Sequence, residues 1–236
     1  MIDRILDFIY PRKCEICKRP VDRPGRYLCT DCLNRLPILP SQGVCRICGR
    51  DAVGNKGEFL CEDCRKHKPG FDRAVTAVSF DGEARELVNA FKFRNSLYLL
   101  KDLVDLLEGA TRARLKVNEI DLVLPMPSTG WHRFLRGYNQ CEYLARALAK
   151  RLGKRYNRWL LKRVGSPRRQ GELNESERLE NVIGTFALRR PINVDTVLVV
   201  DDIMTTGATL SECAKTLKKA GVHRVFTASV ARSVRY

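Results

Sequence analysis

Beyond residue 71 the chain alternates between two patterns of hydrophobic and polar positions. Short, mostly apolar runs typical of strands lie at 74–80, 122–124, 184–188, 196–200 and 224–230. Longer runs with apolar residues at helical spacing lie at 84–93, 97–114, 140–152 and 208–220. Strands that alternate with helices predict an α/β fold in which a mostly parallel sheet is flanked by helices on both faces.

The first 68 residues follow another pattern and hold eight of the ten cysteines in four Cys-x-x-Cys pairs. Eleven residues separate the first pair from the second, and twelve separate the third from the fourth. One such turn directs two thiolates at an ion, and two turns complete a tetrahedral site. We therefore predict structural Zn²⁺, which replaces a core that so short a segment builds poorly. The predicted ligands are Cys14, Cys17, Cys29, Cys32, Cys45, Cys48, Cys61 and Cys64.

The cysteine pairs leave some alternatives open. Pairing neighbours gives two zinc ribbons, whereas pairing the first with the third gives a cross-brace with the same number of ions. Disulfides are disfavoured because no secretion signal is evident and cytosolic thiols stay reduced. An iron–sulfur cluster is a further alternative, although the spacing favours zinc. Cys141 and Cys213 lie on predicted helices and are expected to be buried small hydrophobes.

Glycine and proline at 66–70 mark a hinge. We therefore predict two domains, a zinc module over 1–68 and an α/β domain over 69–236. The 236 residues are 44% hydrophobic and 30% charged, a globular balance, and no apolar run is long enough to span a membrane. The sequence therefore predicts a soluble cytoplasmic protein.

The net charge of +16 is concentrated in one stretch. Residues 130–191 hold fifteen Lys and Arg against five Asp and Glu, a surplus of +10. Such a surplus favours a polyanion, either a phosphorylated small molecule or a nucleic acid, although a plain solvated face has the same composition.

The run from Val197 to Leu210 holds the strongest indication of a ligand-binding site. An apolar strand ends in Asp201 and Asp202, and a short loop rich in threonine and glycine then leads into a helix. In a parallel sheet, ligands bind beyond the carboxyl ends of the strands, and a helix N-terminus favours phosphate. Two carboxylates suit vicinal hydroxyls and Mg²⁺ on the same ligand. The run lacks the glycine patterns of P-loop and dinucleotide folds.

This run resembles the phosphoribosyl-pyrophosphate signature of type I phosphoribosyltransferases. With the cysteine pairs, the whole chain resembles the ComF/GntX family of competence-associated proteins, which join a double zinc ribbon to a phosphoribosyltransferase-like domain. Further matching segments are Val123-Leu124-Pro125-Met126-Pro127, Arg136-Gly137-Tyr138-Asn139-Gln140, and the stretch from Arg169-Gln170 to Gly184-Thr185-Phe186.

The resemblance implies roles for individual residues. Asp201 and Asp202 would be the catalytic pair that binds the ribose hydroxyls, and the turn at Pro125, Met126 and Pro127 would be the pyrophosphate loop. The implied 5′-phosphate ligands are Thr205, Thr206, Gly207, Ala208 and Thr209.

Basic residues around this site are expected to bind phosphate as well. Arg133 and Arg136 would clamp pyrophosphate, and Arg169 lies in a basic loop suited to a lid. Lys92 is a weaker phosphate contact, or else a surface lysine.

The implied activity is a glycosyltransferase reaction. With Mg²⁺, ribose 5-phosphate would pass from phosphoribosyl pyrophosphate to an unknown nitrogen acceptor, in a context of competence and DNA uptake. The alternative is a non-catalytic factor that binds single-stranded DNA through the zinc ribbons and the basic stretch, where aromatic residues accompany the arginines. Proteins of the competence machinery are the expected partners.

Overall fold

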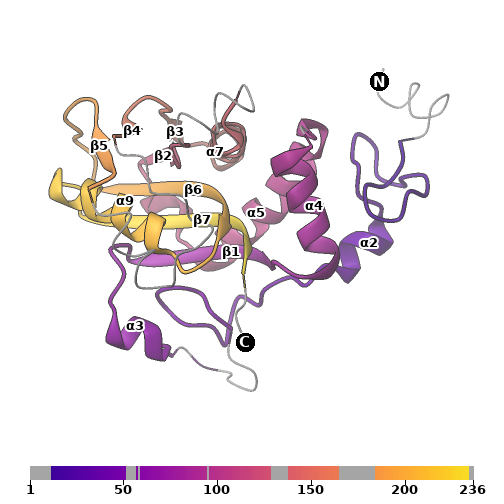
Figure 1. Ribbon diagram of the computed structural model, residues 1–236, viewed down its shortest axis with the longest axis horizontal. Helices are drawn as coiled ribbons and strands as arrows, with labels where there is room; N and C mark the ends of the chain where they lie inside the picture. Colours follow the sequence, from indigo (N-terminus) through magenta and orange to yellow (C-terminus); the bar gives the residue numbers. More distant parts are fainter. Residues whose placement is uncertain are drawn as a thin grey trace.

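The computed structural model describes residues 12–51, 57, 59–94, 96–128, 138–164 and 184–233. A sheet of five strands in the order β1-β7-β6-β2-β3 forms its centre (Figure 1). Every neighbouring pair is parallel, as the alternating pattern predicts. The strands are β1 (Arg73–Ser79), β2 (Leu122–Pro125), β3 (Arg155–Tyr156), β6 (Thr196–Met204) and β7 (Arg224–Arg232).

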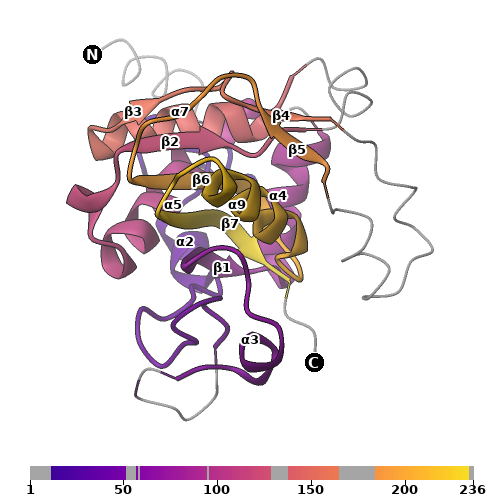
Figure 2. The ribbon, with the colours of Figure 1, turned by 90° about the vertical axis from the view of Figure 1, so that its left-hand side faces the viewer.

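Helices cover both faces of this sheet (Figure 2). Leu198 and Val200 of β6 join one core, and Val197 and Val199 join another. Alternate side chains of a strand point to opposite faces, so β6 is buried on both sides. The first core contains α4 (Gly82–Phe93), α5 (Leu100–Arg114) and α7 (Gln140–Leu152), and the second contains α9 (Ala208–Lys219). Short 3₁₀ helices lie at η1 (Leu97–Leu99) and η2 (Val117–Glu119).

Helix α7 has the bounds that the apolar spacing predicts. Asn139 caps its start, because the side-chain oxygen accepts a hydrogen bond from the Cys141 N–H at 3.1 Å. Gly153 ends it in the left-handed conformation, with φ of +65°. Both ends are thus set by the local sequence.

Strand β6 is longer than its apolar run predicts. The run ends at Val200, but the strand continues to Met204, which pairs with Arg232 of β7. The carboxylates interrupt the apolar pattern without interrupting the backbone ladder, which does not depend on side chains. Asp201 and Asp202 therefore lie within a rigid strand and not in the loop after it.

A separate antiparallel hairpin joins β4 (Leu161–Arg163) to β5 (Phe186–Leu188). Strand β5 lies within the segment 184–188 that the sequence predicts. Residues 165–183, between the two strands, are outside the described part of the chain.

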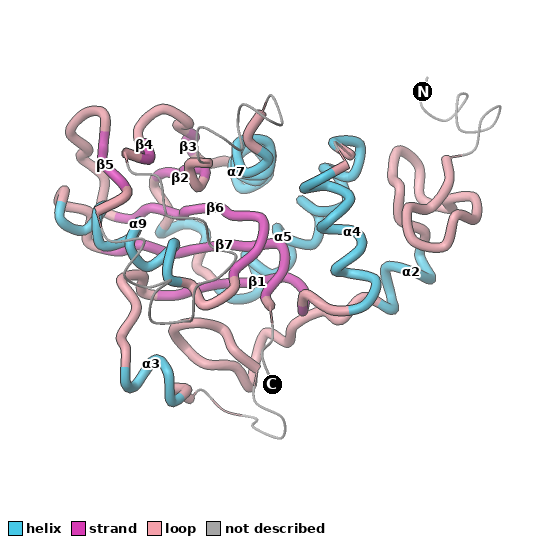
Figure 3. The backbone as a smooth tube through the Cα atoms, in the orientation of Figure 1, coloured by secondary structure: helices cyan, strands magenta, loops and turns pink. Residues whose placement is uncertain are grey.

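In its described residues, the N-terminal segment is mostly loop, interrupted by short helices (Figure 3). It covers the β1 edge of the sheet through backbone hydrogen bonds. Leu39 N–H donates to Ala77 O, Ser79 N–H donates to Pro37 O, and Ala74 N–H donates to Ile47 O. An exposed edge strand invites pairing with other chains, and this cover removes that hazard. The helices are α2 (Thr30–Arg35) and α3 (Glu62–Lys66).

The predicted hinge at 66–70 is packed against α9. Gly70 N–H donates to Ser211 Oγ at 2.8 Å, and a Cβ at Gly70 would lie 2.4 Å from the Ser211 carbonyl oxygen. This connection is therefore a close backbone contact, which needs glycine.

The domain boundary at 68/69 stays a prediction. Among the described helices, none has the length and apolar character needed to cross a membrane.

Candidate functional site

The eight paired cysteines form two separate clusters. In each cluster the four Sγ atoms lie within 4.8 Å of one another, which is close enough to hold one ion. Neighbouring pairs therefore combine, and the cross-brace arrangement is excluded. We call the first cluster ribbon 1 (Cys14, Cys17, Cys29, Cys32) and the second ribbon 2 (Cys45, Cys48, Cys61, Cys64).

Donors around the sulfur atoms suit thiolate ligands. The Arg35 guanidinium lies 3.1 Å from Cys32 Sγ, and Cys61 N–H donates to Cys45 Sγ at 3.4 Å. Such contacts offset the negative charge that four thiolates place on Zn²⁺, and they orient the ligands. The residues of both clusters therefore fit structural zinc.

Three elements meet at the two aspartates. Lys92, from the last turn of α4, lies 3.1 Å from Asp202 Oδ2. Cys141, in the first turn of α7, donates from Sγ to Asp201 Oδ1 at 3.3 Å. Asp202 and Cys141 are buried, while Asp201 is partly exposed. The carboxylate pair is therefore fixed from two sides and open on one.

Burial and neighbouring charges shift the pKa values of Asp201, Cys141 and Lys92. Burial, together with the charge of Asp202, raises the pKa of Asp201 to about 7. Burial also raises the pKa of the Cys141 thiol well above its ordinary value, so this side chain stays a protonated donor. Burial by itself would lower the pKa of Lys92, but the carboxylates of Asp202 and Asp201 outweigh it, and that pKa is raised. The pair is thus suited to receive a hydroxyl group or a cation.

The loop after β6 leaves a helix N-terminus uncapped. Gly207 adopts φ of +82°, and a Cβ there would lie 2.7 Å from Met204 Cε and 3.6 Å from the Phe71 ring. Gly207 has no side chain to cap α9, so the first turn, apart from the Ala208 N–H, forms a helix N-terminus of the kind that favours an anion. Thr206 adds a hydroxyl, whose Oγ1 accepts from Ala208 N–H at 3.3 Å.

The turn after β2 lies directly beside β6. Pro125 pairs in register with Val200, and Met126 N–H donates to Val200 O at 2.8 Å. Asn139 Nδ2 in turn donates to Met126 O at 3.0 Å, which fixes the turn against α7. The structure therefore brings the predicted Pro125–Pro127 turn to the same edge as the carboxylate pair.

Ribbon 2 reaches this same edge. A cleft of about 640 Å³ separates it from the N-terminus of α9, with Cys64 on one side and Thr206 and Gly207 on the other. The side chain of Arg232, only 4% exposed, donates to Cys48 O and lies 3.7 Å from Met204 Sδ. Ribbon 2 is thus joined through buried contacts to the strand that leads into the loop.

The remaining residues that the sequence singled out are either outside the described residues or make contacts that the sequence did not indicate. Arg133, Arg136 and Arg169 lie outside the described residues. Lys92 is partly buried and pairs with Asp202, a contact that neither sequence alternative includes, and its contact with phosphate stays a prediction. Cys141 is buried as expected but also donates to Asp201, a role that its apolar neighbours in the sequence did not indicate.

Comparisons with known proteins identify both parts of the chain. Residues 5–67 match the double zinc ribbon domain, and residues 139–234 match the phosphoribosyl transferase domain. Competence protein F of Haemophilus influenzae is 27% identical over 230 residues, which cover 94% of this chain and 97% of that protein. DNA utilization protein YhgH of Salmonella typhimurium is 25% identical and covers 91% of this chain and 94% of its own length.

A purine phosphoribosyltransferase from Pyrococcus horikoshii, known as a crystal structure, is 18% identical with a TM-score of 0.35 and covers 58% of this chain and 74% of that one. The two domain matches and the relatives that span nearly the full length identify the chain more specifically. The chain therefore joins a double zinc ribbon domain to a phosphoribosyl transferase domain, and over nearly its full length it is similar to Competence protein F and to DNA utilization protein YhgH, in agreement with its resemblance to the ComF/GntX family.

Proposed function

We propose that this protein is a phosphoribosyltransferase that binds phosphoribosyl pyrophosphate with Mg²⁺ and transfers ribose 5-phosphate to a nitrogen nucleophile. The observation that carries the proposal is the juxtaposition of three features at one sheet edge. The partly open Asp201–Asp202 pair lies between the uncapped start of α9 and the turn after β2. A ligand with hydroxyls in its middle and phosphates at both ends matches this order.

Each group has a distinct task. The Asp201 and Asp202 carboxylates accept hydrogen bonds from the ribose hydroxyls, and the Thr205–Thr209 backbone and hydroxyls donate to the 5′-phosphate. Lys92 holds Asp202 in place and keeps the pair from carrying two uncompensated charges. The Met126–Pro127 turn would face the pyrophosphate, and Arg133, Arg136 and Arg169, which lie outside the described residues, stay predicted phosphate ligands.

The oxygen ligands of this site also fit Mg²⁺. Two adjacent carboxylates offer the hard oxygen ligands that Mg²⁺ prefers. When bound, Mg²⁺ would neutralise charge on the departing pyrophosphate. The chain's own groups orient the donor and exclude water, so that the C1–oxygen bond breaks as the acceptor nitrogen bonds to C1.

The relatives suggest where this activity acts. Two of them carry the names Competence protein F and DNA utilization protein, which supports a role in DNA uptake. A cytoplasmic location and partners from the competence machinery remain part of the proposal. The alternative function, binding of single-stranded DNA without catalysis, is favoured by the +10 charge of residues 130–191. It predicts a salt-dependent DNA affinity that is indifferent to Asp201 and Asp202.

Calorimetric titration of phosphoribosyl pyrophosphate into the zinc-loaded protein with Mg²⁺ tests the proposal. We expect micromolar binding, about −8 kcal/mol, that disappears in an Asp201→Asn/Asp202→Asn variant. Asp195→Asn is the matched control, because Asp195 is an exposed carboxylate just before the opposite end of β6. Absence of binding by the folded wild type, or equal loss in the control, would refute the donor site.

A further inference from the structure

A second cleft lies on the other side of α7 from the carboxylate pair. Its volume is about 940 Å³, within the range of small-ligand sites. Cys141 faces Asp201, whereas its neighbours Glu142 and Tyr143 line this cleft. Consecutive helical residues point about 100° apart, so one helix serves two separate sites. The donor site described above does not use these residues.

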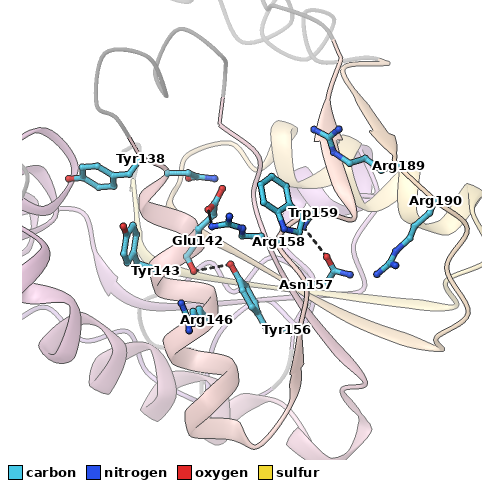
Figure 4. Close-up of a pocket in the computed structure, with 11 residues that line it drawn as sticks. Tyr138, Glu142, Tyr143, Arg146, Tyr156, Asn157, Arg158, Trp159, Arg189 and Arg190 are labelled. Carbon is cyan, nitrogen blue, oxygen red and sulfur yellow. Dashed lines mark hydrogen bonds and ion pairs between the residues drawn. The ribbon is translucent and has the colours of Figure 1, made fainter.

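The walls of the cleft come from three parts of the α/β domain (Figure 4). Side chains of α7 form one wall, the segment after β3 forms the floor, and the segment after β5 stands opposite α7. Tyr156 Oη donates to the Glu142 carbonyl at 3.2 Å, and Asn157 Oδ1 accepts from Trp159 N–H at 2.9 Å. The first bond fixes the floor relative to α7 and the second fixes the shape of the floor itself, so the cleft is largely preformed.

Aromatic surface and positive charge coincide here. Trp159 is 53% exposed, and the Arg158 guanidinium stacks on its ring at 4.1 Å. Tyr138 and Tyr143 meet edge to face at 5.7 Å, and Tyr143 is 41% exposed. These aromatic side chains line one cleft together, and grouped exposed apolar surface of this kind, unlike a single exposed residue, indicates a binding site. The four arginines of the cleft face a single carboxylate; they are Arg146, Arg158, Arg189 and Arg190.

The ion pairs leave this charge mostly uncompensated. Among the described residues, Glu142 pairs with Arg158 at 3.5 Å, and Arg146, Arg189 and Arg190 have no carboxylate within 4.0 Å. Guanidinium groups bind phosphate oxygens in a fork, and aromatic faces stack on bases. A purely apolar partner would leave the arginines desolvated, and inorganic phosphate alone would leave the aromatic surface uncovered.

We propose that this cleft binds a nucleotide, with the base stacked on the Trp159 side and the phosphate held by Arg146 and Arg190. The nucleotide is either free or one residue of a single strand, because both present the same base and phosphate. This site is additional to the proposed donor site and does not depend on transferase activity.

Thymidine 5′-monophosphate and a short oligothymidylate, titrated into the full-length zinc-loaded protein, test the proposal. We expect saturable binding by calorimetry and quenching of tryptophan fluorescence. A Trp159→Phe variant should lose the quenching but keep its affinity within about threefold, because phenylalanine still stacks. An Arg146→Gln/Arg190→Gln variant should lose at least about tenfold in affinity.

Arg85→Gln is the matched control, since Arg85 is an exposed arginine of α4 outside the cleft. It should stay within about twofold of the wild type. The Asp201→Asn/Asp202→Asn variant should also bind normally, so failure of the donor site and failure of this site are distinguishable. Tighter binding of the oligonucleotide identifies a single strand as the ligand, and equal binding identifies the free nucleotide.

Three results would overturn the proposal. The first is that neither probe binds. The second is that the arginine variant binds as well as the Arg85→Gln control. The third is that inorganic phosphate binds as tightly as the nucleotide, which would leave no role for the aromatic surface.

Discussion

The two zinc ribbons have nearly the same cysteine spacing but attach to the α/β domain in different ways. Ribbon 1 packs buried cysteines into the core that contains α4 and α5, and ion pairs add to this contact, including Arg23 with Asp102 and Arg35 with Glu83. Ribbon 2 is held by buried contacts to β1 and β7, and it lines a cleft shared with the loop after β6. The same metal motif thus has two different roles in this protein. Ribbon 1 fastens the module, and ribbon 2 supports the proposed phosphate site.

The largest expected effect comes from removing two cysteine ligands from one ribbon at a time. Cys45→Ser/Cys48→Ser should reduce the zinc content from about two ions to about one per chain and weaken phosphoribosyl pyrophosphate binding by more than about tenfold. Cys29→Ser/Cys32→Ser should lose the same amount of zinc and keep the affinity within about threefold. Zinc analysis and calorimetry measure both. Equal affinity losses in the two variants would show that the ribbons do not differ in this way.

The next effect concerns how ribbon 1 is fastened. The fully buried Asp102 carboxylate accepts from Tyr27 N–H at 2.8 Å and pairs with Arg23 at 3.2 Å. Asp102→Ala leaves both donors without this partner, so we expect the free energy of unfolding to fall by about 3 kcal/mol. Glu83→Ala, which breaks the more exposed pair with Arg35, should cost about 1 kcal/mol or less. Denaturant unfolding compares the two, and similar losses would contradict a special role for Asp102.

A third effect tests the support of the loop after β6. Gly207→Ala meets both a positive φ and the Met204 side chain, so it should cost about 2 kcal/mol and reduce donor binding. Gly221→Ala is matched, because φ is +98° there and a Cβ would meet no atom within 4 Å. It should lose about 1 kcal/mol of stability and bind the donor normally. Melting curves and calorimetry check both, and unchanged binding in Gly207→Ala would exclude this loop from the site.

The smallest effect depends on pH. The pKa of Asp201 is about 7 in the folded protein and near 3.8 when unfolded, so the folded state holds an extra proton between these values. This contribution to stability is complete below about pH 4 and is lost as the pH rises to 7. Asp201→Asn should therefore gain about 1 kcal/mol more over the wild type at pH 8 than at pH 6. Melting temperatures measured without Mg²⁺ test this, and an equal gain at both pH values would contradict the shift.

The sequence predicts most of the fold because its signals are local. The bounds of α7 follow from apolar spacing with Asn139 and Gly153 at the ends. The apolar run of β6 is correct but too short, because carboxylates interrupt a pattern of side chains and not the ladder of the backbone. The two-residue strand β3 carries no such signal, since its place is set by pairing with β2.

The sequence alone determined the eight cysteine ligands, the alternation of strands and helices in the α/β domain, and the Asp201–Asp202 pair with its threonine- and glycine-rich loop. These depend on spacing within a few residues, which fixes the local geometry. Only the tertiary structure decided that Lys92 and Cys141 meet the aspartates, that ribbon 2 lies beside Gly207, and that the arginines and Trp159 share a cleft. Lys92 and Asp202 are 110 positions apart, and Cys141 and Asp201 are 60 apart. Such contacts arise when strands and helices pack, and no local pattern of residues encodes them.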